Sequence, residues 1–153
     1  MKLAILSDTH NLLRPQVLEA IRGVDAILHG GDISRQEILD RLSGLAPVYA
    51  VRGNNDKEWA EQLPHDLTLT LEGVTFYMVH KKAEVPGDLS GVDVIVCGHS
   101  HKYSEELRDG VLWLNPGSCG PRRFHQDITM AVMEIANGRY TVEKLLIPHE
   151  PKK

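Results

Sequence analysis

The chain of 153 residues carries a formal net charge of −4 and is 42% hydrophobic, which is typical of one soluble globular domain. With no basic run and only 5% aromatic residues, it favours neither a groove for duplex nucleic acid nor a stacking platform for single strands. No stretch is apolar for long enough to cross a bilayer, no signal peptide is recognised in MKLAILSDTH, and two cysteines are too few for a disulfide scaffold. We therefore expect a cytoplasmic protein with a single domain over residues 1–153.

Short apolar runs alternate with helical patterns in the first half of the chain. Strands are expected at 3–6, 26–28 and 48–51. Between them, one helix opens at Pro15 and ends at Gly23, and a second follows a capping box of Ser34 and Glu37 and ends at Gly44; a short helix over 57–63 comes last. A β-α-β-α-β series of this kind implies parallel strands with crossover helices.

The second half of the chain favours antiparallel strand pairs. Hairpins are expected over 67–79, 103–115 and 128–147, with turns at Glu72-Gly73, Asp109-Gly110 and Asn137-Gly138. The whole pattern predicts an α/β fold of two sheets packed face to face, with helices outside.

Polar side chains that can bind metals follow five of the apolar runs, each time at the C-terminal end. In chain order these are Asp8 and His10, then Asp32, then Asn54, Asn55 and Asp56, then His80, then His99 and His101. In open α/β sheets such strand ends gather along one edge, where ligands bind. One D-x-H or H-x-H alone would be unremarkable, but five at equivalent positions predict a common site. We expect His29 to be structural and His65, His125 and His149 to lie in loops or near the tail.

The chemistry of this set indicates two metal ions. Two aspartates, one asparagine and four histidines form a mixed oxygen and nitrogen shell, which suits Mn, Fe, Co or Zn better than calcium or magnesium. Seven side chains are too many for one ion that must also bind substrate, but suit two ions that share a bridging carboxylate. Two divalent ions bring four positive charges and two aspartates remove two, so the site would attract phosphate.

The ordered motifs D-x-H, G-D, G-N-x-D, H and G-H-x-H resemble the calcineurin-like metallophosphoesterase superfamily. Together with the short chain, the NPGS sequence at 115–118 looks most like its small phosphodiesterases of the YfcE type. The resemblance spans almost the whole chain and implies a four-layer α-β-β-α sandwich of two mixed sheets. It also implies a phosphoric diester hydrolase with two divalent ions, for which Mn²⁺ is our expectation and Fe, Zn, Co and Ni are alternatives.

The resemblance assigns a role to each metal-competent residue. Asp8, His10 and His101 would hold one metal, Asn54, His80 and His99 the other, and Asp32 would bridge them. A hydroxide that bridges the metals would attack phosphorus without a covalent enzyme intermediate. We place the catalytic role on Asp32, Asn54 and His99.

Substrate contacts are expected from three further residues, Asn55, Arg122 and Arg123. Many relatives have histidine where this chain has Asn55, and an amide cannot act as a general acid, so diesters should be preferred over alkyl monoesters. A contact from Lys81 stays open, Cys119 is expected to be an inert small side chain, and Cys97 belongs to the core.

Two other functions remain open at this point. A phosphomonoesterase acting on a nucleotide or phosphoprotein is one. The other is a non-catalytic binding scaffold, because a retromer subunit resembles this fold. The expected partner is a small phosphoester, without duplex nucleic acid or membrane; homo-oligomerisation is left open.

Overall fold

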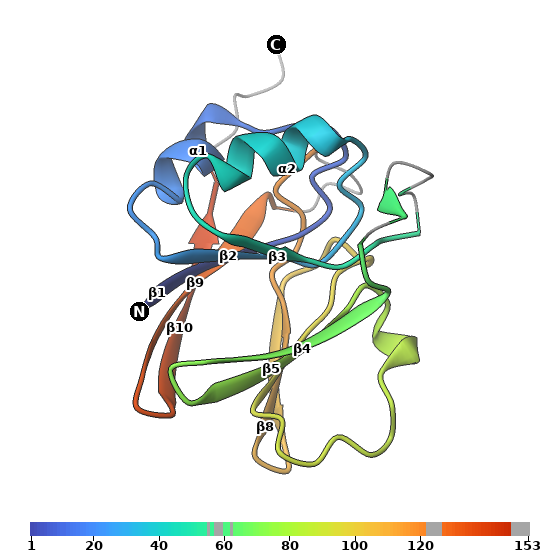
Figure 1. Ribbon diagram of the computed structural model, residues 1–153, viewed down its shortest axis with the longest axis vertical. Helices are drawn as coiled ribbons and strands as arrows, with labels where there is room; N and C mark the ends of the chain where they lie inside the picture. The colour runs from blue at the N-terminus through green and yellow to red at the C-terminus, as the bar shows by residue number, and fades with distance from the viewer. Residues whose placement is uncertain (55, 57–59, 62, 122–126, 148–153) are drawn as a thin grey trace.

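The computed structural model describes residues 1–54, 56, 60–61, 63–121 and 127–147. Its strands form two five-stranded mixed sheets that face each other (Figure 1). In spatial order the first sheet consists of β10 (Arg139–Leu146), β9 (Thr129–Ala136), β1 (Lys2–Leu6), β2 (Ala26–His29) and β3 (Val48–Ala50). The second consists of β4 (Asp66–Leu71), β5 (Val74–Val79), β6 (Val94–Val96), β8 (Val111–Asn115) and β7 (Ser104–Arg108).

Strand β1 contributes side chains to two separate hydrophobic cores, one between the sheets and one under the helices. Successive side chains of a strand point to opposite faces, so Leu3 and Ile5 pack between the sheets while Ala4 and Leu6 pack against the helices. All four are fully buried, as expected for a central strand whose two faces are both covered. β1, β2 and β3 run parallel, as the β-α-β-α-β pattern predicts.

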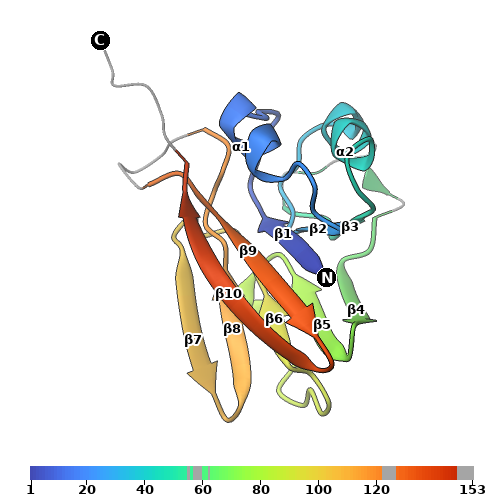
Figure 2. The same cartoon turned by 90° about the vertical axis from the view of Figure 1, so that its left-hand side faces the viewer.

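The outer face of the first sheet is covered by α1 (Pro15–Ala20) and α2 (Gln36–Ser43), as Figure 2 shows. The predicted capping box is wrong, because Arg35 is the N-cap residue of α2 and no side chain caps the helix. Ser34 instead has a φ of 85° and donates its backbone N–H to Asp56. No helix among the described residues is both long and apolar enough to cross a membrane.

A thinner layer covers the outer face of the second sheet. A short 3₁₀ helix, η2 (Lys82–Glu84), and the chain after it bring Val85 and Leu89 over a buried patch that includes Val79 and Ile95. The predicted sandwich of two mixed sheets is confirmed, with this turn and loop in the position of the fourth layer.

The three predicted hairpins are confirmed, β4–β5, β7–β8 and β9–β10. Both residues of each turn have positive φ, at Glu72-Gly73, Asp109-Gly110 and Asn137-Gly138. Such turns match the right-handed twist of the strands that they join. Of the predicted helix at 57–63, residues 57–59 and 62 lie outside the described part of the chain.

Candidate metal centre

The loops that follow β1, β2, β5 and β6 bring six of the predicted residues into two clusters. Asp8, His10 and His101 form one cluster, and Asp32, His80 and His99 form the other. Within each cluster, one potential ligand atom of every residue lies within 4.8 Å of those of the other two. Each cluster has the ligand chemistry of a transition-metal site, and could hold one ion.

The two clusters adjoin each other. His10 Nε2 lies 3.6 Å from both Asp8 Oδ1 and Asp32 Oδ2, one carboxylate from each cluster. His80 Nε2 lies 3.2 Å from Asp32 Oδ2 and 3.9 Å from Asp8 Oδ1. The donor atoms therefore form one continuous group, in which Asp32 contacts histidines of both clusters.

Four buried polar atoms at this site lack a hydrogen-bond partner. They are Asp8 Oδ1, His10 Nε2, His80 Nε2 and His101 Nδ1, and across the described residues no other buried side-chain nitrogen or oxygen is in this state. An unsatisfied buried polar group costs about 1–3 kcal/mol, so four in one place require an explanation. Metal coordination supplies it, and the residues present fit a pair of divalent ions.

Five of the six cluster residues have a left-handed backbone conformation. Asp8, His10, Asp32, His99 and His101 have φ angles of 56°, 45°, 57°, 73° and 64°. The left-handed conformation disfavours residues with a Cβ, and such strain clusters at functional sites, where it aims side chains. Here it occurs in the loops after β1, β2 and β6.

The carboxylate of Asp8 is fixed by two donors on one side. Ser7 Oγ donates to Asp8 Oδ2 at 2.7 Å, and the backbone N–H of His99 donates to the same oxygen at 3.1 Å. Burial raises the pKa of Asp8, but the nearby His10, His101 and His80 and the Ser7 hydroxyl together lower it further, so the net pKa is well below its usual value. Asp8 is thus held as a carboxylate with Oδ1 directed to the site.

His80 is oriented by its second ring nitrogen. Nδ1 lies 2.8 Å from the carbonyl oxygen of Gly30, which can only accept, so Nδ1 carries a proton and Nε2 is directed toward the carboxylates of Asp32 and Asp8. Fixing a histidine through its other nitrogen is the usual support of a metal ligand. Burial lowers the pKa of His80, but the carboxylates of Asp32 and Asp8 raise it above its usual value.

Asp56 supports the loop that carries Asp32. Its Oδ1 accepts the backbone N–H groups of Ile33 and Ser34 at 2.9 and 2.8 Å, and its Oδ2 accepts that of Gly53 at 2.9 Å. Asp56 was among the polar strand-end residues of the sequence, but this positioning role was not foreseen.

Close packing explains the glycines in these loops. A Cβ on Gly98 would collide with the side chains of Ser7 and Asp8, and one on Gly53 would collide with Asp32. Asn54, the remaining predicted ligand, is exposed in the loop directly after Gly53. Of the predicted substrate contacts, Asn55, Arg122 and Arg123 lie outside the described residues.

The NPGS segment ties the site loops together. Asn115 Nδ2 donates to the carbonyl of Gly98 at 3.1 Å, and Ser118 Oγ donates to the carbonyl of Asp8 at 3.0 Å. From the sequence, this segment was recognised only through its resemblance to the family, and its role in holding the loops was not predicted. A hydrogen bond between residues 110 positions apart leaves no local sequence pattern.

The other histidines and both cysteines lie outside the two clusters where they are described. His29 is buried and bonded at both nitrogens, to Thr9 Oγ1 and the backbone N–H of Gly31, each at 3.1 Å, as a structural residue. His65 is exposed beside Glu84. Burial raises the pKa of Cys97 and Cys119 to about 12, so both are inert thiols. His125 and His149 lie outside the described residues.

Comparison with known families places this geometry in a class. Residues 1–138 match the model of the calcineurin-like phosphoesterase superfamily domain, and the chain belongs to that superfamily. A probable metallophosphoesterase of Methanothermobacter thermautotrophicus is 35% identical over 133 residues, which cover 77% of each chain. A phosphodiesterase of Methanocaldococcus jannaschii is 30% identical, over 78% of this chain and 84% of its own.

Two solved structures share the fold. YfcE, a phosphoesterase from E. coli, superposes with a TM-score of 0.71 at 26% identity, over 97% of this chain and all of its own. Vps29 from Entamoeba histolytica, solved in complex with zinc, superposes with a TM-score of 0.75 at 22% identity, over 97% and 100% of the two chains. The predicted family is thus confirmed, and the likeness to Vps29 concerns the fold alone.

Proposed function

We propose that this protein is a metal-dependent phosphodiesterase that uses two divalent ions. The observation that carries the proposal is the pair of adjoining clusters, whose residues carry four buried polar atoms without a hydrogen-bond partner. The relatives named phosphodiesterase and phosphoesterase support the reaction class.

Each metal position has its own set of side chains in this proposal. Asp8, His10 and His101 hold one ion, Asn54, His80 and His99 the other, and Asp32 lies between them. When bound, two such ions would supply an activated water as nucleophile and positive charge that attracts the anionic phosphoester. Mn²⁺ is the ion that we propose, with Fe, Zn, Co and Ni as alternatives, because the donor set mixes oxygen with imidazole nitrogen.

The chain itself contributes orientation and charge balance. Ser7 and the His99 backbone hold the Asp8 carboxylate, and Gly30 holds the His80 ring, so little reorganisation is needed when a substrate binds. Two carboxylates against two divalent ions leave the site cationic. Asn54 offers a neutral amide oxygen, which completes a shell without removing positive charge. Asn55, Arg122 and Arg123 are the proposed phosphate contacts.

The test is hydrolysis of bis(p-nitrophenyl) phosphate by metal-free protein, with and without added Mn²⁺. We expect turnover only with metal, and expect Asp32→Asn to reduce it more than ~100-fold, because the shared carboxylate is lost. Asp109→Asn, the same change on an exposed turn, should keep wild-type activity. Absence of metal-dependent turnover in the wild type would refute the proposal.

A non-catalytic scaffold is the alternative that the fold of Vps29 raises. A scaffold does not require four buried polar atoms without hydrogen-bond partners, or five residues with positive φ, at one site. Both features therefore favour the enzyme. The variant Asp32→Asn separates the two functions as well, since it would abolish turnover in an enzyme and leave partner binding intact in a scaffold.

A further inference from the structure

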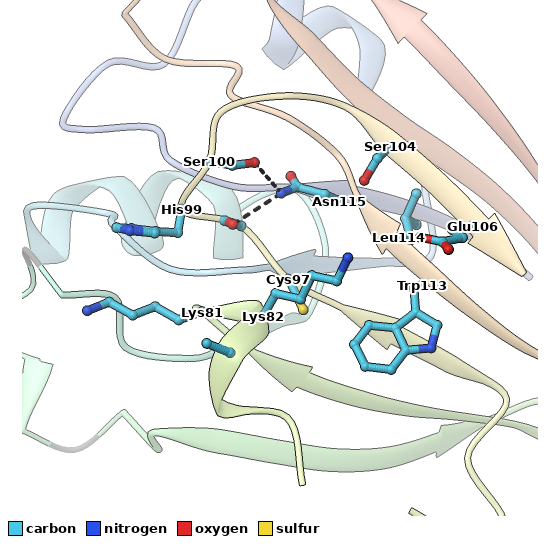
Figure 3. Close-up of a pocket in the computed structure, with 12 residues that line it drawn as sticks. Lys81, Lys82, Cys97, His99, Ser100, Ser104, Glu106, Trp113, Leu114 and Asn115 are labelled. Atoms are coloured by element: carbon cyan, nitrogen blue, oxygen red, sulfur yellow. Dashed lines mark hydrogen bonds between the residues drawn. The ribbon is translucent and has the colours of Figure 1, made fainter. Parts of the chain in front are cut away.

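A pocket of about 480 Å³ opens beside the candidate metal centre, on the outer face of the second sheet. It lies between the turn at η2 and the strands β7 and β8, and His99 lines it as well as the metal cluster (Figure 3). The thin fourth layer leaves this part of the sheet open. Its size falls within the range of about 300–1,000 Å³ that is typical of small-molecule sites.

The pocket carries excess positive charge. Lys81 and Lys82 line one side, and neither forms an ion pair with any described residue. The carboxylate in the lining, Glu106, is already matched by Arg108, whose Nε and Nη2 each lie 2.8 Å from one of its oxygens. The two lysines are therefore available to an anionic ligand.

The aromatic side chain of Trp113 also lines the pocket. Trp113 is half-buried on β8 and packed against the outer apolar patch. Two cations lie near the centre of its ring, the guanidinium carbon of Arg108 at 5.0 Å and the ammonium of Lys82 at 5.7 Å. In Figure 3, His99 and Trp113 stand at opposite ends of the pocket. An indole beside a cation suits a flat aromatic ring attached to an anionic group, because stacking and charge attraction then act together.

The far wall offers polar groups in fixed positions. Asn115 Nδ2 donates to Ser100 Oγ at 3.0 Å and to the carbonyl of Gly98. Ser104 adds a hydroxyl to the same lining, whereas Leu114 and Cys97 are apolar. An apolar pocket with a few fixed polar groups is the usual design of a site that selects one ligand.

We propose that this pocket is the subsite for one ester arm of the substrate, and that it selects phosphodiesters whose arm carries a flat aromatic ring, such as a nucleobase or an aryl group. The ring lies against Trp113 at one end of the pocket, and the phosphate lies at the His99 end, where Lys81 supplies positive charge (Figure 3). This proposal rests on the proposed phosphodiesterase function, since it places the scissile phosphate at the metal centre.

The test compares two probes that differ by the ring, adenosine 5′-monophosphate and ribose 5-phosphate, in equilibrium binding to Mn²⁺-loaded protein by calorimetry. We expect the ring to raise affinity about tenfold in the wild type. Trp113→Leu should abolish this difference, whereas Trp113→Phe, which keeps an aromatic face, should retain most of it. Lys81→Ala should weaken both probes alike, and Lys144→Ala, an exposed lysine outside the pocket, should weaken neither.

Equal affinity for the two probes in the wild type would overturn the proposal, as would an undiminished difference in Trp113→Leu. A parallel assay with bis(p-nitrophenyl) phosphate separates this failure from that of the function. There we expect Trp113→Leu to raise KM with little change in kcat. Normal hydrolysis by Trp113→Leu with an unchanged KM would refute the subsite but not the phosphodiesterase function. Absence of hydrolysis by the wild type would refute the phosphodiesterase function, and the binding data would still test the subsite.

Discussion

His29 and His80 show at the scale of single residues how surroundings decide what a histidine does. Both are buried near the ends of strands, and both bond to the chain around Gly30 and Gly31. His29 accepts the backbone N–H of Gly31 at one nitrogen and meets Thr9 at the other, so no lone pair remains for a metal. His80 donates to a carbonyl through Nδ1 and directs its second nitrogen toward the Asp32 carboxylate, 3.2 Å away at the site.

The first prediction concerns stability against pH. Burial lowers the pKa of His29 to about 4, below its ordinary value of 6.5. Between these values the unfolded chain binds a proton that the folded protein excludes, so the contribution of His29 is present above pH 6.5 and is lost as pH falls toward 4. The expected loss is about 3 kcal/mol in the free energy of unfolding.

Urea unfolding of metal-free protein across this pH range measures that loss. The variant His29→Gln should show a smaller fall in stability than the wild type, because the remaining histidines titrate in both proteins. Equal pH dependence in the two proteins would contradict the assignment to His29.

At the scale of elements, the site loops after β1, β2 and β6 each contain residues with positive φ close to the strand end. The turn after β6 depends on Gly98, since its missing side chain lets this loop approach Ser7 and Asp8 after β1. These contacts hold ligands of both clusters in register with each other, because His99 donates its backbone N–H to Asp8.

We therefore expect Gly98→Ala to reduce metal-dependent activity by at least ~10-fold, because the added methyl group collides with Ser7 and displaces Asp8. Gly87→Ala is the matched control, as nothing lies within 4 Å of its added Cβ and its φ is not positive. Activity and Mn²⁺ affinity measured on both variants check the prediction. Wild-type values for Gly98→Ala would show that the close approach of the two loops is not required.

The sequence allowed the strands, the hairpins and the grouping of the metal-competent residues to be predicted, but not the contacts between distant loops. Alternating apolar patterns and turn pairs such as Asn137-Gly138 act locally, so strands and hairpins could be placed. The metal-competent residues could be grouped because parallel strand ends share an edge. The capping box at Ser34 failed because Asp56, 22 residues away, holds this backbone N–H, and contacts between distant loops leave no local signal.

At the scale of the whole molecule, the core between the sheets holds the two halves of the site together. Asp8, His10 and Asp32 come from loops of the first sheet, and His80, His99 and His101 from loops of the second. Phe76 on β5 is fully buried in this core, together with residues of β1 such as Leu3 and Ile5. Each cluster thus combines residues from both sheets, so packing between the sheets sets the distances between ligands within each cluster.

Phe76→Ala should lower the free energy of unfolding by about 3–5 kcal/mol, the usual cost of a large cavity in a core. Leu107→Ala, at a side chain that is 68% exposed, should change it by less than ~0.5 kcal/mol. Denaturant unfolding of both variants measures the difference. A loss for Phe76→Ala as small as that for Leu107→Ala would show that the inter-sheet core is not packed as described.

The central claim is that seven side chains hold two metal ions side by side. Calorimetric titration of metal-free protein with Mn²⁺ tests it most directly. We predict two equivalents per chain for the wild type, loss of one equivalent on replacing His10 and His101 together by alanine, and two equivalents for His65→Ala, an exposed histidine outside the clusters. A wild-type protein that binds one equivalent or none would contradict the account.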